Sequence, residues 1–401
     1  MEKFTGSFTQ QEPIPEEGIL AATQVMRSGR LHRYNTENGE ISQTAQLEVE
    51  FAAAMGARYC LAVASGGYAM ATALRALGVR PGEKVLTNVF TLAPVPGAIA
   101  SLGAVPVFVG VTPSLTLDLD DLQEKIAQSG ARVLLLSHMR GHLCDMDRLM
   151  AIADAADVAV VEDCAHTMGA RWNGKLSGTQ GVFGCYSTQT YKHLNSGEGG
   201  LLISDDPDLM ARAIILSGSY MLYDRHKAAP PPEAFEALRY ETPNISGRMD
   251  NLRAAILRPQ LAQLDAQIAR WNERYRIVEE GLAGTPGLQL TQRPEAEDFV
   301  GSSIQFLLPD WDSAEVAQVL KRCMDRGVEL KWFGGAEPTG FTSRYDSWRY
   351  VQSPRLPQSD RILAATMDMR LPLTFSPGDC ALVARIIRAE VSAVWQARAA
   401  W

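Results

Sequence analysis

The chain has little of what marks secreted, metal-binding or nucleic-acid-binding proteins. Its 401 residues include only six cysteines, at positions 60, 144, 164, 185, 323 and 380, with no CxxC pair and no His/Cys cluster at metal-ligand spacing. We therefore expect neither disulfides nor a metal site. No basic stripe or lysine-rich tail is present and the formal net charge is -8, so a nucleic acid is not an expected partner.

Long uninterrupted apolar runs are also missing. Prolines and glycines punctuate the one long apolar stretch, Thr91 to Val111, which is expected to form a short helix and a strand rather than a membrane span. The first residues, Met1 to Glu17, contain four glutamates where a secretory signal needs an apolar core. We therefore expect a cytoplasmic protein with no membrane partner.

What the chain does have is a regular alternation of short apolar runs and amphipathic segments. Hydrophobic residues make up 46% of the sequence, enough for a large core, and the length favours two domains. The expected strands are Tyr59 to Ala64, Lys84 to Asn88, Val105 to Val109, Arg132 to Ser137, Val158 to Glu162, Phe183 to Ser187 and Leu201 to Ser204, and the helical segments between them include Ala69 to Leu77, Leu119 to Ser129 and Met146 to Ala156. This βαβ rhythm predicts an α/β domain with a mainly parallel sheet.

The pattern changes after a proline-rich segment. Ala228 to Pro232 is expected to be an irregular exposed loop, and a single long helix is expected from about Asp250 to Leu282. We therefore divide the chain into a large α/β domain over residues 1–250 and, over residues 251–401, the long linking helix with a smaller α+β domain.

One lysine lies in surroundings that suit pyridoxal phosphate (PLP) chemistry. Lys192 is flanked by polar and glycine residues in the run Tyr191 to Gly200. A lysine forms an imine with an aldehyde only when part of its population is neutral, which burial or neighbouring cations bring about. The ordinary alternative is a solvated surface lysine.

Two other features stand at the ends of expected strands. Gly66 and Gly67 open a helix after the first strand, where backbone N–H groups can approach a phosphate, although an ordinary turn has the same composition. Asp163 follows another strand and could hold a pyridinium nitrogen in its protonated form, or could instead cap a helix.

An aromatic residue and two histidines complete the candidates. Phe90 follows a strand and could stack on a flat pyridine ring, although a core phenylalanine is the commoner explanation. His166 and His138 could bind the cofactor's phenolic oxygen or the substrate, or be core histidines with satisfied hydrogen bonds.

The order of glycine-rich turn, aromatic residue, strand-end aspartate and lysine resembles the sugar aminotransferase (DegT/StrS) family of fold-type I PLP enzymes. The resemblance covers nearly the whole chain and includes Arg27 to Arg30, Leu47 to Ala52, Gly103 to Val109, His138 to Asp147 and Arg248 to Ala255. It implies a large domain with a mainly parallel sheet flanked by helices, and a smaller C-terminal α+β domain.

The resemblance also implies a role for each candidate residue. Lys192 is expected to be the Schiff-base lysine and the general acid and base, Asp163 the pyridinium partner, and Phe90 the stacking aromatic. His166 is expected near the phenolic oxygen. The expected phosphate ligands are Gly66, Gly67 and Ser187.

The family is built as a homodimer with active sites at the interface, and the same is expected here. In the family an asparagine two residues before the arginine of the Arg248-Met249 pair reaches the partner subunit's cofactor. Here Ser246 stands at that position, and Asn244 is its displaced substitute. Gly67 stands where the family has threonine, and Lys331 to Gly334 replaces a segment that contains histidine.

The activity implied by the resemblance is transamination. PLP and its amine form, PMP, would interconvert in a ping-pong cycle that moves an amino group from glutamate or glutamine to a keto-sugar, a nucleotide-linked keto-sugar or a keto-cyclitol. No metal is required. The run Glu162 to His166, the run Gly169 to Trp172 and Gln189 look similar to the branch of the family that acts on keto-cyclitols of the scyllo-inosose type. The alternatives are another PLP reaction, such as dehydration, retro-aldol cleavage or decarboxylation, and a non-catalytic PLP-binding regulatory protein.

Overall fold

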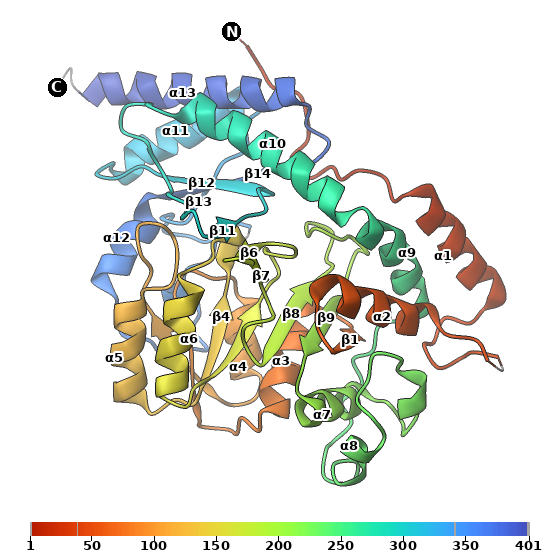
Figure 1. The fold of residues 1–401 in the computed structure, drawn as a ribbon. Helices are drawn as coiled ribbons and strands as arrows, with labels where there is room; N and C mark the ends of the chain where they lie inside the picture. The colour runs from red at the N-terminus through yellow and green to blue at the C-terminus, as the bar shows by residue number, and fades with distance from the viewer. Residues whose placement is uncertain (1, 38, 341, 399–401) are drawn as a thin grey trace.

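A seven-stranded sheet forms the centre of the larger part of the molecule (Figure 1). The computed structural model describes residues 2–37, 39–340 and 342–398. The strands run in the order β1-β9-β8-β5-β4-β2-β3, and only the pairings of β9 with β1 and β8 are antiparallel. Their bounds are β1 (Tyr59–Val63), β2 (Lys84–Asn88), β3 (Val105–Val109), β4 (Val133–Ser137), β5 (Ala159–Asp163), β8 (Phe183–Ser187) and β9 (Gly200–Ser204). All the strands expected from the sequence are present, and the predicted α/β class with a mainly parallel sheet is confirmed.

Helices cover both faces of this sheet, because its strands bury side chains on both sides. In β1, Leu61 and Val63 pack in one apolar cluster while Cys60 and Ala62 pack in another, as the alternation of a strand requires. The first cluster lies against α3 (Gly66–Ala76), α4 (Pro94–Ala100), α7 (Pro207–Ser217) and α8 (Glu233–Glu236). The other face is covered by α2 (Gln43–Met55), α5 (Leu119–Ser129) and α6 (Met146–Ala155).

Local signals in the sequence set the ends of these helices. The side chain of Asp118 accepts hydrogen bonds from the backbone N–H groups of Asp120 and Asp121 and so caps the start of α5. Gly130 ends the helix with a φ of 65 degrees, in the left-handed region that glycine adopts without strain. The predicted bounds of this helix are therefore confirmed.

A second, antiparallel sheet lies towards the C-terminus of the chain. Its strand order is β10-β12-β14-β13, with bounds β10 (Gln289–Leu290), β12 (Ser303–Leu307), β13 (Lys331–Trp332) and β14 (Thr366–Arg370). The helices α10 (Leu264–Leu282), α11 (Ser313–Asp325) and α13 (Pro377–Arg398) pack on it (Figure 1). The N-terminal residues Phe4 and Phe8 join this core, each with its ring edge-to-face against Phe375. The division of the chain at residue 250 stays a prediction.

Smaller elements complete the fold. They are α1 (Glu16–Ser28), α12 (Pro357–Ala365) and a three-stranded sheet of β11 (Glu297–Asp298), β6 (Arg171–Trp172) and β7 (Lys175–Leu176). All six cysteines are free and buried. Within the described part of the chain, no helix has both the length and the apolar composition needed to cross a membrane.

The single long helix expected from Asp250 to Leu282 is wrong in detail. Two consecutive helices occupy this region, α9 (Asn251–Ala262) and α10, separated at Gln263. Pro259 lies inside α9, where it has no N–H to donate and its ring crowds the preceding turn. A break within the turn that follows is a common consequence of an internal proline.

The proline-rich segment is irregular, as expected, but it is not exposed throughout. Ala228 and Pro230 are buried. The carbonyl oxygen of Ala228 accepts a hydrogen bond of 3.0 Å from the N–H of Cys60 in β1. Because β1 is the last strand at its edge of the sheet, this segment covers backbone groups that would otherwise be unpaired.

Candidate active site

A cavity of about 540 Å³ lies where the carboxyl ends of the parallel strands face the second sheet. Its lining includes residues from both sides, among them Gly66, Ser187 and Lys192 from the larger part and Ser302 and Arg370 from the second sheet. A smaller recess of about 90 Å³ shares part of this lining and adds Ser137 and Asp163. Ligands of α/β proteins bind in such positions.

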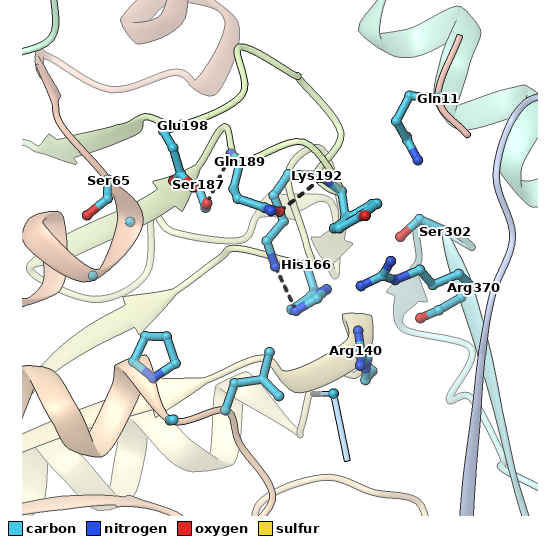
Figure 2. Close-up of a pocket in the computed structure, with 18 of the residues that line it drawn as sticks. Gln11, Ser65, Arg140, His166, Ser187, Gln189, Lys192, Glu198, Ser302 and Arg370 are labelled. Atoms are coloured by element: carbon cyan, nitrogen blue, oxygen red, sulfur yellow. Dashed lines mark hydrogen bonds between the residues drawn. The ribbon is translucent and has the colours of Figure 1, made fainter. Parts of the chain in front are cut away.

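Lys192 lies at the centre of this cavity. Its Nζ is 3.0 Å from Nε2 of His166, and Figure 2 shows the two side chains pointing at each other. Burial, together with the positive charges of Arg140 and Arg370, lowers the pKa of Lys192 to about 7, although Asp163 acts in the opposite direction. A large fraction of this amine is therefore neutral near pH 7, which is the condition for imine formation.

His166 is held in the neutral form. Burial first, and then the positive charges of Lys192 and Arg140, lower the pKa of His166 well below its usual value. A neutral imidazole can both donate and accept a hydrogen bond, and the Lys192 amino group occupies one of its ring nitrogens.

Asp163 lies at the inner end of the site, at the end of β5. Its carboxylate accepts hydrogen bonds from the N–H of Ala165 at 3.1 Å and from the hydroxyl of Ser137 at 3.0 Å. The hydroxyl of Ser137 in turn accepts a bond of 2.9 Å from Thr91. Burial raises the pKa of Asp163. The residues that follow form a turn and no helix begins there, so the alternative of a helix cap does not apply.

The opposite end of the site is the N-terminus of α3. A Cβ added at Gly66 would lie 2.9 Å from Cβ of Ser187, so only glycine fits this close approach to β8. At Gly67 the nearest atom would be 3.8 Å away, which leaves room for a side chain. Backbone N–H groups at a helix start, beside the Ser187 hydroxyl, form a suitable cradle for a phosphate.

Phe90, Asn244 and His138 do not join this group. Phe90 is 1% exposed and packs edge-to-face on Phe333 at 5.1 Å, and it is not among the residues that line either cavity. Leu92 and Pro94 line both cavities, and the stacking of the Phe90 ring on the cofactor stays a prediction. Asn244 is exposed and its side-chain oxygen accepts the N–H of Ser246. Its role towards a partner subunit stays a prediction.

His138 is a core histidine, in agreement with the second of its two interpretations. Its Nε2 lies 2.9 Å from the buried carboxylate of Glu162. That carboxylate also accepts the backbone N–H groups of Gly178, Gln180 and Gly181. The pair therefore fixes the loop before β8, behind the site rather than in it.

Several residues of the cavity had no role in the sequence interpretation. They are Gln11, Ser137, Trp271, Ser302, Arg140 and Arg370. Arg140 stands inside the quoted run His138 to Asp147, where its charge was a signal that could have been used. Gln11, Trp271, Ser302 and Arg370 come from distant segments with no local pattern.

The residues present fit PLP. The cavity offers an amine with a lowered pKa for the aldehyde, a buried carboxylate for the ring nitrogen and a helix N-terminus with a serine for the phosphate. These three groups lie along one continuous recess, as a flat cofactor with a phosphate arm requires.

Comparisons with known proteins agree with this fit. The model of the DegT/DnrJ/EryC1/StrS aminotransferase family matches residues 13–388. An L-glutamine:2-deoxy-scyllo-inosose aminotransferase of Micromonospora echinospora is 32% identical over 282 residues, which are 69% of this chain and 66% of that protein.

Solved structures show the same fold. A 3-amino-5-hydroxybenzoic acid synthase matches with a TM-score of 0.82 at 24% identity, covering 98% of this chain and 99% of that one. The E. coli GDP-4-keto-6-deoxy-D-mannose-3-dehydratase, solved with bound hydrated PLP, matches with a TM-score of 0.81 at 17% identity, covering 96% of this chain and 100% of that one. Because the family model spans nearly the whole chain, the protein belongs to the DegT/DnrJ/EryC1/StrS aminotransferase family and is a PLP-dependent aminotransferase.

Proposed function

We propose that the protein moves an amino group from glutamate or glutamine to the ketone of a keto-cyclitol, a keto-sugar or a nucleotide-linked keto-sugar, in a ping-pong cycle. The observation that carries this proposal is the Lys192 amino group, which lies 3.0 Å from a neutral His166 in the cavity and has a pKa of about 7. The similarity to an enzyme named for glutamine and a deoxy-scyllo-inosose supports the donor and the cyclitol class of acceptor.

In this proposal Lys192 moves the proton. A neutral Nζ can take a proton from the substrate carbon and return it, and a pKa near neutral pH suits both directions of transfer. PLP, when bound, supplies the electron sink that makes this proton acidic. His166 then binds the cofactor's phenolic oxygen by a hydrogen bond that does not need an added charge.

The remaining roles follow from position. Asp163 pairs with the ring nitrogen, and its bond from Ser137 keeps the carboxylate in place. Gly66, Gly67 and Ser187 hold the phosphate. Leu92 lines both cavities and would contact the cofactor there.

A homodimer and a cytoplasmic location remain proposals. Asn244 is exposed near the C-terminal end of α7 and is therefore accessible to a second subunit. A concentration series in gel filtration, with activity measured on each fraction, tests the assembly. An active monomer would remove Asn244 from the site.

The first experiment follows the amino group. The protein loaded with PLP is given glutamate or glutamine labelled with ¹⁵N at the α-amino group, and then scyllo-inosose or a keto-sugar. We expect the cofactor's visible band to disappear with the donor and to return with the acceptor, and mass spectrometry to find ¹⁵N in the product. Lys192→Ala should abolish both changes, whereas Lys175→Ala, on an exposed strand, should leave them intact.

The other reactions on this scaffold give different products. Dehydration is the second candidate, because a dehydratase shares the fold. Loss of water without transfer of ¹⁵N would favour dehydration. Release of carbon dioxide or of an aldehyde fragment would favour decarboxylation or retro-aldol cleavage. A cofactor band that no amino donor changes would favour a regulatory PLP-binding protein.

A further inference from the structure

Two arginines line the outer part of the cavity from opposite sides. Arg140 lies in the short 3-10 helix η1 (Met139–Gly141) after β4, and Arg370 is the last residue of β14 in the second sheet. Both line the same cavity as Lys192. Figure 2 shows the guanidinium of Arg370 extending from the second sheet towards His166, with Arg140 close to it.

Arg140 is held in a costly arrangement. Its side chain is 5% exposed, and its backbone is left-handed, with φ 56 and ψ 22 degrees, which is uncommon for a residue with a side chain. Its Nη2 lies 2.8 Å from a carboxylate oxygen of Asp368, but neither Nη2 nor Nε has a partner with hydrogen-bond geometry among the described residues. A buried donor without a partner is unfavourable, because it has lost its hydrogen bonds to water. Strain and unmet donors at one cavity indicate a ligand more than a structural role.

A third cation lies near the two arginines. Lys331 lies on β13, and burial, together with the positive charges of Arg370 and Arg140, lowers its pKa to about 8, while Asp368 acts in the opposite direction. The positive charges of Arg140, Arg370 and Lys331 on this side of the cavity favour an anion.

We propose that Arg140 and Arg370 form a binding site for a carboxylate of the substrate, next to the amino group of Lys192. This inference rests on the proposed amino transfer. A guanidinium presents paired N–H donors that match the two oxygens of a carboxylate. Both arginines line the same cavity as Lys192, so a carboxylate bound between them lies near the carbon that exchanges its amino group.

Binding of a substrate mimic tests the site without turnover. Maleate, which carries two carboxylates and no amino or keto group, is titrated calorimetrically into the PLP-loaded protein. We expect Arg140→Gln and Arg370→Gln each to weaken its binding at least about tenfold, which is about 1.4 kcal/mol. Arg132→Gln, at a side chain that is 75% exposed, is the matched control and should change the affinity less than about twofold.

Three results would overturn the proposal. They are no maleate binding to the wild-type protein, equal affinity in both variants and the wild type, or stronger arginine-dependent binding of uridine diphosphate than of maleate. Arg140→Lys and Arg370→Lys keep the positive charge, and circular dichroism of all variants identifies any that fail to fold. Failure of amino transfer with intact maleate binding would refute the proposed function and leave the carboxylate site standing.

The amino donor and the acceptor are the two sources of such a carboxylate, and the two half-reactions separate them. In single turnovers, Arg370→Gln is compared with wild type for the glutamate concentration that gives half-maximal bleaching of the cofactor band. The acceptor concentration that restores the band is measured in the same way. An increase of about tenfold or more in the glutamate concentration alone assigns the site to the donor. The same increase in the acceptor concentration alone assigns it to a carboxylated acceptor. No increase in either value would overturn the proposal.

Discussion

Replacing Arg140 with glutamine should raise the pKa of Lys192 and reduce the neutral fraction of the amine on which imine formation depends. The pKa of Lys192 is lowered from 10.5 to about 7. At pH 7.5 this makes about three quarters of the amine neutral, whereas an ordinary lysine is only about 0.1% neutral. Arg140 is the second cause of this change, after burial.

The size of the effect follows from the charge that is removed. A unit charge at a separation on the order of 8 Å contributes about 2 kcal/mol at an effective dielectric constant of 20. At about 1.4 kcal/mol per pKa unit, the variant should titrate roughly 1.5 pKa units higher, near 8.5. It should not reach 10.5, because burial, the larger cause, is unchanged.

The assay is a carbon NMR titration of the apoprotein carrying lysine labelled at Cε, with the Lys192 signal assigned by its loss in Lys192→Ala. The rate of PLP capture, measured by absorbance over the same pH range, should rise with pH through about 7 in the wild type. A lysine peptide reacting with PLP under the same conditions corrects for titration of PLP itself. A wild-type midpoint near 10.5, or an unchanged midpoint in Arg140→Gln, would refute the reasoning.

Three further predictions concern the cofactor cradle, its ring contact and the stability of the fold. Gly66→Ala should lower the free energy of unfolding by about 1–3 kcal/mol and weaken PLP binding, because its Cβ would lie 2.9 Å from a serine side chain, whereas Gly67→Ala should do neither; equal PLP affinities and melting temperatures would contradict this. Asp163→Asn should reduce the rate of the half-reaction with glutamate by at least about a hundredfold with PLP still bound, and a rate near wild type in a stopped-flow measurement would exclude the ring-nitrogen role. Glu48→Gln should lower the free energy of unfolding by about 3–5 kcal/mol in urea, because it breaks the buried ion pair with Arg33. The pKa of Glu48 is lowered from 4.5 to about 2, so its contribution in the wild type is present above pH 4.5 and should be lost as the pH falls towards 2.

Much of the large sheet could be predicted because its signals are local. The strand Val133–Ser137 was recognisable because a strand buried on both faces is a continuous apolar run. The helix Leu119–Ser129 was recognisable because Asp118 and Gly130 mark its ends. The break at Gln263 was missed, because an apolar pattern continues across it, although Pro259 was a local signal for a break.

The residues of the candidate site that the sequence predicted are those that lie in a recognisable local motif. Lys192, Asp163 and Gly66 each follow a strand in a characteristic run, and the structure places all three around one recess. Phe90 packs on Phe333, and the sequence could not predict this contact, because the direction of a side chain just beyond a strand depends on the turn that follows. Leu92, two residues later, faces the cavity.

The sequence by itself therefore determined the strands, the helix ends and those residues of the recess that lie in local motifs, namely Lys192, Asp163 and Gly66. Only the tertiary structure decided which charges surround the amine of Lys192, because Arg140 lies in η1 after β4 of the large sheet, whereas Arg370 ends β14 of the second sheet, and the two are far apart in the chain. The physical reason is the sequence distance over which each interaction acts. Periodicity and capping act over a few residues, whereas burial and Coulomb interaction depend on distances that exist only after the two parts of the chain have packed together.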